Sequence, residues 1–179
     1  LLECFHGPDP LIISADGGID NTYRLGLAPH VVIGDMDSID RKKYSGRLSR
    51  ARSVPAPGDK DESDTRLAVE YVVKEGIGDI TIAGGTGKRI DHTFANMLLL
   101  ASPDLEHASV RMVTEESEIF CMSGTGTIKG SRGKLVSIFS LTPYTSFIKT
   151  TGLKFPLKEE RPYQSPVKGL SNVFTSEEA

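Results

Sequence analysis

The 179-residue sequence has few cysteines, no excess of positive charge and no long apolar run, and each shortage excludes a class of protein. Its two cysteines, Cys4 and Cys121, lie far apart and outside any C-x-x-C arrangement, which argues against a disulfide framework or a zinc cluster. They are typical of free thiols in a reducing compartment, so we expect a cytoplasmic protein. The formal net charge of −3, from 21 basic and 24 acidic residues, provides no positive field for a nucleic-acid backbone.

Apolar segments are short as well. The longest, 97–101, is followed at once by Ser102 and Pro103, whereas a membrane span needs about 20 consecutive apolar residues. Hydrophobic residues still make up 38% of the chain, beside 18 glycines and 10 prolines, which excludes collagen-like and disordered compositions. The sequence therefore predicts a soluble globular protein that binds neither membranes nor nucleic acid.

Aspartate divides the chain into two unlike halves, because eleven of the twelve aspartates precede Pro103. Before it, apolar runs that end in Gly/Asp clusters alternate with helical patterns, at 11–13, 19–25, 31–33, 64–75, 80–83 and 91–100. This alternation predicts an α/β domain with a parallel sheet over residues 1–103. The stretches between 109 and 149 are β-like, without a helical pattern, and predict a small antiparallel sandwich or barrel over residues 104–179.

Two aspartates follow the apolar run 31–33. Gly34 leaves room for the backbone, and Asp35 and Asp37 point to the same side of an extended chain at the carboxyl end of the strand. Carboxylates in this position, together with water and phosphate oxygens, are ligands of Mg²⁺. A solvated turn after a strand has the same local pattern, so the pair alone leaves both interpretations open.

A second acidic cluster precedes the helix expected to begin at Asp64. Four of the six residues 59–64 are acidic. Helix capping and the positive end of the helix dipole account for one or two of them. The others repel one another unless a positive charge lies nearby, so the cluster indicates a metal or a cationic ligand.

Three glycines lie between an expected strand and an expected helix in segment 83–92. Their N–H groups can approach an anion at a helix N-terminus, and Lys88 and Arg89 add charge suited to phosphate. The segment is not a Walker A loop, because no Ser or Thr follows Lys88. It is not a full dinucleotide fingerprint either, because Ile90 replaces the third glycine. We interpret it as a phosphate site, with an ordinary tight turn as the alternative.

The chain contains four motifs in order: Ala-Asp-Gly-Gly at 15–18, Gly-Asp-Met-Asp-Ser at 34–38, Lys-Asp-Glu-Ser-Asp at 60–64 and Gly-Gly-Thr-Gly-Lys-Arg-Ile-Asp-His at 84–92. Together they resemble the thiamine pyrophosphokinase, or thiamine diphosphokinase, family. The resemblance continues through 151–157 and 169–172 and so covers nearly the whole chain. It implies a Rossmann-like catalytic domain, then a small antiparallel β-sandwich that binds thiamine and forms the homodimer. The implied reaction transfers pyrophosphate from the co-substrate ATP to the hydroxyl of thiamine, giving thiamine diphosphate and AMP.

The resemblance also implies roles for individual residues. The residues expected to hold Mg²⁺ are Asp35, Asp37 and Asp64, which together with Asp16 form the expected catalytic set. The residues expected to bind ATP and its phosphates are Lys60, Ser63, Gly85, Gly87, Lys88, Arg89 and Asp91. Thiamine is expected to contact Asp16 and, across a dimer interface, Ser171 and Asn172. Either Asp16 or Asp37 is expected to accept the hydroxyl proton.

The sequence departs from the family in three respects. Ser63 stands where the family usually has threonine, which preserves the hydroxyl. The chain has no tryptophan, although some members pack one on thiamine, so another residue must stack there. The family's first strand is expected before Leu1 and its last after Ala179, and we therefore expect a longer natural product.

Two other functions compete with this interpretation. A Mg²⁺-dependent phosphatase of the haloacid-dehalogenase type also has a strand followed by Asp-x-Asp, and it would form an aspartyl-phosphate. It usually has Thr or Val where Ile39 stands here, and it leaves both the glycine segment 83–92 and the motif at 171–172 unexplained. A protein that only binds nucleotide or thiamine would need the pockets but not the acidic motifs.

Overall fold

The computed structural model describes residues 9–35, 39, 44, 46, 50–56, 62–142, 149–158 and 169–179. The chain divides into two compact units, Leu1–Cys121 and Met122–Ala179. No helix in these described ranges is long and apolar enough to cross a membrane.

A parallel three-stranded sheet opens the first unit. It consists of β1 (Ile13–Ala15), β2 (Val31–Gly34) and β3 (Arg52–Pro55), with β2 in the centre. All four residues of β2 are buried, as expected for a parallel strand covered on both faces. A short 3₁₀ turn, η2 (Asp16–Gly18), and helix α1 (Ile19–Arg24) follow β1. The predicted strand–loop–helix order is therefore confirmed here.

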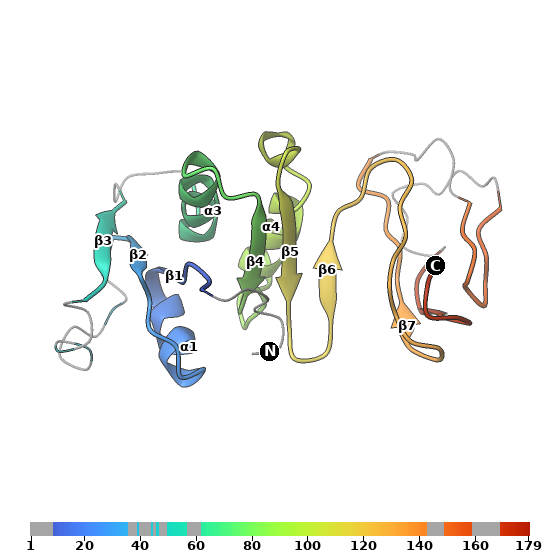
Figure 1. The fold of residues 1–179 in the computed structure, drawn as a ribbon, viewed down its shortest axis with the longest axis horizontal. Coiled ribbons are helices and arrows are strands. Elements are labelled where there is room, and N and C mark those ends of the chain that lie inside the picture. Colours follow the sequence, from blue (N-terminus) through green and yellow to red (C-terminus); the bar gives the residue numbers. More distant parts are fainter. Residues whose placement is uncertain are drawn as a thin grey trace. The chain divides into compact units, whose positions relative to one another are not determined.

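The second sheet of this unit contains β4 (Asp79–Ala83), β5 (Ser109–Val113) and β6 (Glu118–Phe120), which lie side by side in Figure 1. Strands β4 and β5 are parallel, and β6 is antiparallel to β5. Helix α4 (Ile90–Leu99) and the turn η3 (Pro103–Leu105) connect β4 to β5. A helical crossover of this kind is what allows two successive strands to run parallel.

This arrangement differs from the predicted boundary at Pro103. The stretch at 109–113, assigned from the sequence to the antiparallel second half, is β5 and pairs with β4. Its apolar side chains Val110 and Met112 are buried against the helices of the first unit. The contact boundary consequently falls after Cys121. The change in composition near Pro103 marks the end of the aspartate-rich loops and not the end of the sheet.

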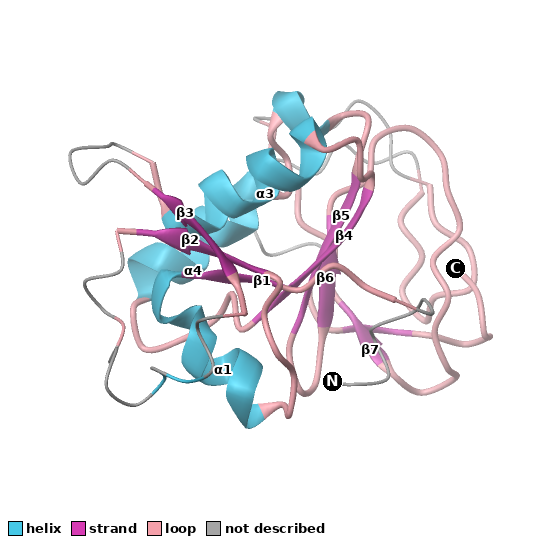
Figure 2. Cartoon of the chain, turned by 60° about the vertical axis from the view of Figure 1, so that its left-hand side comes forward, coloured by secondary structure: helices cyan, strands magenta, loops and turns pink. Residues whose placement is uncertain are grey.

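Helix α3 (Asp64–Lys74) packs on β1 and β2 and against α4, as can be followed in Figure 2. The main core lies between these helices and the second sheet, with Met112 fully buried at 0% exposure. Its buried members are Val69, Ile80, Ile82, Leu99, Leu100, Leu105, Val110 and Met112. A second cluster beneath α1 contains Ile19, Val32, Ile39 and Tyr44.

The second unit consists mainly of loops with short antiparallel pairings (Figure 2). Strand β7 (Leu135–Val136) pairs with β8 (Asn172–Val173), and isolated bridges join Lys129 to Glu178 and Leu153 to Phe174. Leu153, Leu157 and Phe174 are buried. The described part of this unit therefore has the antiparallel character that its sequence predicts.

Candidate functional site

Asp16 occupies the turn directly after β1. Its φ of 42° lies in the left-handed region, which non-glycine residues seldom adopt and which is often found at functional sites. Its Oδ1 atom is buried and has no hydrogen-bond partner within the described part of the chain. A buried carboxylate oxygen without a donor is costly. This oxygen therefore fits a cation or a hydrogen-bond donor supplied by a ligand.

The end of β2 fixes the position of this turn. Ala15 pairs with Ile33, so Asp16 lies opposite Gly34 at the next step of the ladder. A Cβ atom built on Gly34 would lie 2.9 Å from Asp16 Cβ, and the φ of Gly34 is +150°, so glycine is required here. The next residue, Asp35, is exposed. The structure thus brings Asp16 and Asp35 together at the carboxyl ends of neighbouring parallel strands.

The third motif leads into helix α3. Ser63 is its N-cap, with Oγ accepting a hydrogen bond of 3.2 Å from Arg66 N, and Asp64 lies in the first turn. Arg66 forms ion pairs with Glu62, Glu70 and Asp104. The sequence interpretation missed Arg66, which relieves part of the negative charge in this cluster. Its signal was the spacing of four residues from each of the two glutamates.

Two predicted site residues, Asp37 and Lys60, lie outside the described residues. Over the described ranges, no three His, Cys, Asp or Glu side chains are grouped so as to hold a metal ion. The predicted Mg²⁺ set of Asp35, Asp37 and Asp64 thus stays a prediction. The buried Asp16 Oδ1 shows that this sheet edge has a carboxylate oxygen suited to a positive charge.

The glycine segment leaves β4 at Gly84 and is held by α4. Gly85 O accepts a hydrogen bond of 2.8 Å from Asn96 Nδ2, and a Cβ on Gly85 would lie 2.3 Å from Met112 Sδ. Gly87 N donates to Thr93 Oγ1 at 3.2 Å. The Gly87 N–H is therefore used within the protein, although the sequence interpretation counted it as a donor to phosphate.

Thr93 and Asn96 were not predicted as site residues. Both are buried polar side chains of α4 that bond the preceding loop. Their only sequence signal is the spacing of three residues, which places both on one helix face. They hold the glycine segment in a fixed shape beside the start of α4.

The cationic residues of this segment are exposed. Arg89 pairs with Asp91 through Nη2–Oδ2 at 2.5 Å and Nε–Oδ1 at 3.2 Å, and their side chains are 69% and 61% exposed. The hydrogen bond from Arg89 lowers the pKa of Asp91 to about 2. Lys88 is also exposed. Arg89 is thus held by Asp91 while its remaining N–H groups face outward, in a form suited to phosphate.

The two predicted thiamine contacts other than Asp16 lie in the second unit and differ from each other. Asn172 is only 2% exposed; its Oδ1 accepts from Phe155 N at 3.0 Å and Val173 N at 2.9 Å, and its Nδ2 donates to Phe155 O at 2.7 Å. Ser171 is exposed, with a φ of 55°. Asn172 therefore fixes the backbone of Phe155, whose side chain is 59% exposed beside Lys154. A thiamine contact by Asn172 stays a prediction.

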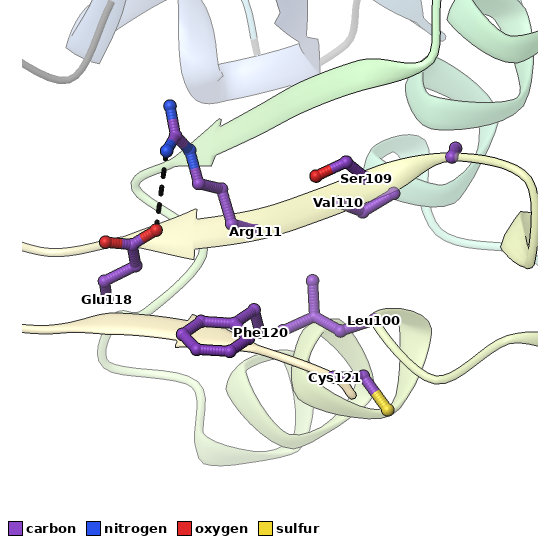
Figure 3. Close-up of a pocket in the computed structure, with 8 residues that line it drawn as sticks. Leu100, Ser109, Val110, Arg111, Glu118, Phe120 and Cys121 are labelled. Carbon is purple, nitrogen blue, oxygen red and sulfur yellow. Dashed lines mark hydrogen bonds and ion pairs between the residues drawn. The ribbon is translucent and has the colours of Figure 1, made fainter. Parts of the chain in front are cut away.

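A separate cavity of about 260 Å³ lies on β5 and β6. Figure 3 shows its lining, including the ion pair between Arg111 Nη1 and Glu118 Oε1 at 3.5 Å. Strand residues Ser109 to Arg111 line it and pair with the first half of β4, whereas the glycine segment follows the last residue of β4. This cavity is therefore at the opposite end of β4 from the glycine segment.

Comparison with known proteins assigns the chain to a family. Residues 6–114 match the family model described as thiamin pyrophosphokinase, catalytic domain. A thiamine pyrophosphokinase of Bacillus subtilis (strain 168) is 26% identical over 153 residues, which cover 82% of this chain and 70% of that protein.

Solved structures agree in fold. The crystal structure of thiamine pyrophosphokinase from Bacillus subtilis matches with a TM-score of 0.86 and 22% identity, over 99% of this chain and 84% of that chain. Thiamin pyrophosphokinase from Candida albicans matches with a TM-score of 0.74 and 18% identity, over 94% and 76%. Since the family model matches more than half of the sequence, the chain belongs to the thiamine pyrophosphokinase family, whose activity is the transfer of pyrophosphate from ATP to thiamine.

Proposed function

We propose that this chain performs the family's reaction where the edge of the first sheet, which carries Asp16 and Asp35, meets the glycine segment 84–89 that follows β4. The observation that carries the proposal is the buried, unpartnered Oδ1 of Asp16, held in place by Gly34. A carboxylate kept in this state suits a cationic or hydrogen-bond-donating substrate. Thiamine has both a permanently positive ring and a hydroxyl, and Coulomb attraction favours it in a partly desolvated site.

The reaction needs its reactants in line and the phosphate charge neutralised. The hydroxyl oxygen of thiamine attacks the β-phosphorus of ATP, the bond from that phosphorus to the α-phosphate's bridging oxygen breaks, and AMP leaves. Asp16 or Asp37 accepts the hydroxyl proton. Lys88 and Arg89 are exposed cations that follow β4 and supply positive charge to the phosphates.

Mg²⁺ would be held by Asp35, Asp37 and Asp64, together with water and phosphate oxygens, and when bound it supplies positive charge to the triphosphate. The support from this structure is the position of Asp35 at the end of β2 and of Asp64 in the first turn of α3, which packs on β2. Ser63 keeps a hydroxyl proton to donate to a phosphate oxygen, because its Oγ serves the helix only as an acceptor.

The resemblance supports further proposals about the whole protein. We infer an α/β catalytic domain followed by a β-sandwich, assembled as a cytoplasmic homodimer. Ser171 and Asn172 would contribute to thiamine binding in that dimer. Phe155 is the exposed aromatic residue of the motif at 151–157, and it is the candidate to stack on thiamine in this tryptophan-free chain.

The direct test is a product assay. The purified protein is incubated with ATP, Mg²⁺ and thiamine, and AMP and thiamine diphosphate are separated by chromatography, with thiamine omitted in one control and Mg²⁺ in another. Equal amounts of AMP and thiamine diphosphate, absent from both controls, are expected. ADP or free phosphate without thiamine diphosphate would contradict the proposal.

A second experiment tests the acidic residues. Asp35→Asn and Asp64→Asn are each expected to lower turnover by at least about 100-fold, because each removes a charged ligand at the phosphates. Their melting temperatures are expected to stay close to that of the parent, since Asp35 is exposed and Asp64 only half-buried. Undiminished turnover in both variants would remove the metal assignment.

A further inference from the structure

Asn21 is a polar residue of α1 that neither the motifs nor the predicted site included. It lies five residues after Asp16, on the helix that begins where the Asp16 turn ends. A Cβ atom built on Gly84 would lie 2.9 Å from Asn21 Nδ2, so the amide of Asn21 rests directly on the first glycine of the segment after β4. Asn21 therefore joins the Asp16 turn to the glycine segment.

The backbone position of Asn21 is well fixed. The neighbouring Thr22 is buried, and its Oγ1 lies 2.7 Å from Ser14 Oγ of β1 and 3.3 Å from Gly18 O. Ile19, one turn earlier, is 1% exposed in the cluster beneath α1. Helix α1 is thus tied to β1, and Asn21 cannot move far without breaking buried contacts.

The side-chain amide of Asn21 is available for hydrogen bonding. Within the described part of the chain, the Asn21 side chain forms no hydrogen bond, and the residue is exposed. Its neighbour Gly84, whose φ is +74°, is a glycine and so has no side chain that could cover the amide. An uncommitted amide has two N–H donors and one acceptor oxygen available to a ligand.

We propose that Asn21 is a further substrate-binding residue, whose Nδ2 donates a hydrogen bond to a phosphate oxygen of the nucleotide where the Asp16 turn meets the glycine segment. The inference rests on the proposed function for the identity of the nucleotide. A neutral donor suits this position, because the exposed Lys88 and Arg89 already supply positive charge while the nearby carboxylates repel phosphate. Gly87 N–H, by contrast, is already bonded to Thr93.

The test separates hydrogen bonding from packing. Asn21→Ala removes the amide and its volume, Asn21→Leu keeps the volume without the polar atoms, and Asn21→Asp replaces the donor with a charge that repels phosphate. Affinity for the Mg²⁺ complex of a non-cleavable α,β-methylene ATP is measured by calorimetry, alongside kcat and KM for ATP and thiamine. Arg24→Gln, at the exposed far end of α1, is the matched control.

Asn21→Ala and Asn21→Leu are both expected to weaken analogue binding and raise KM for ATP about tenfold, which is the effect of one hydrogen bond. Asn21→Asp is expected to weaken analogue binding and raise KM for ATP by about 100-fold. KM for thiamine is expected to change little in these variants, and the Arg24→Gln control is expected to keep the parent's affinity and KM values. Parent affinity in Asn21→Leu but not in Asn21→Ala would show a packing role and overturn the inference, as would parent affinity in both.

The same measurements distinguish failure of the inference from failure of the proposed function. If the parent protein binds the analogue but forms no thiamine diphosphate, the proposed function fails and the Asn21 comparison still stands. If thiamine diphosphate forms at the parent rate in every Asn21 variant with unchanged KM for ATP, only the inference fails.

Discussion

Replacing Asn172 with alanine should destabilise the second unit, although the residue belongs to a motif associated with substrate binding. Asn172 is 2% exposed and makes three hydrogen bonds, two to the backbone of Phe155 and one to Val173 N. A hydrogen bond of this kind contributes about 1 kcal/mol net, and an unpaired buried group costs about 1–3 kcal/mol. Alanine should therefore lower the free energy of unfolding by about 3 kcal/mol.

Urea denaturation followed by circular dichroism measures this loss, and hydrogen exchange at the Phe155 amide shows whether it is local. The midpoint should fall by about 1–3 M, given a urea dependence of about 1–3 kcal/mol per M. Asn172→Asp should also destabilise, because a carboxylate replaces the Nδ2 donor next to Phe155 O. Thr175→Ala, at an exposed position nearby, should change stability by no more than about 0.5 kcal/mol. Parent stability and parent exchange in Asn172→Ala would refute the assignment of these hydrogen bonds.

Two smaller predictions concern the glycine segment. Gly85→Ala should lower the free energy of unfolding by about 1–3 kcal/mol, because its Cβ would lie 2.3 Å from the buried Met112 Sδ. The control variant Gly87→Ala adds a Cβ that meets no atom within 4 Å. Equal melting temperatures of the two variants would contradict this packing. The Asp91 carboxyl should titrate near pH 2 by carbon NMR, and Arg89→Gln should return its pKa toward 3.8. Because the folded pKa is lowered, the stabilisation by this pair should be complete above about pH 3.8 and be lost as the pH falls through about 2; an unchanged Asp91 pKa in Arg89→Gln would assign the shift to another cause.

The elements of the first unit could be predicted closely because their signals are local. The helix expected over 64–75 is α3, Asp64–Lys74, and its start follows from Ser63 as a cap. The run 31–33 is the buried part of β2. Strand direction is not encoded locally in this way, because an apolar stretch such as 109–113 reads the same in parallel and antiparallel sheets. The pairing of this stretch with β4 in the structure decides between the two directions.

The candidate site could be predicted as far as topology determines it. Asp16 and Asp35 follow neighbouring parallel strands and so lie at one sheet edge, whereas the sequence predicted the parallel sheet but not which strands are neighbours. The contacts of Asn21 with Gly84 and of Asn96 with Gly85 depend on how helices lie over the sheet, and no local pattern records that. For Asn172 the sequence instead suggested too much. Its residue type suits a ligand contact, but it is buried and its side chain bonds other parts of the protein.

The parallel pairing of β1 with β2 fixes the distance between the two carboxylates that follow these strands. Asp16 and Gly34 follow Ala15 and Ile33, the last pair of the β1–β2 ladder, so the separation between Asp16 and Asp35 is set by strand spacing and not by the connecting loops. The loops can therefore vary in length without displacing the carboxylates. A slip of one residue would turn every β2 side chain to the other face and place a residue with a Cβ atom opposite Asp16, where only Gly34 leaves room. The positions of the two carboxylates are thus fixed by the folded sheet itself, before any substrate binds.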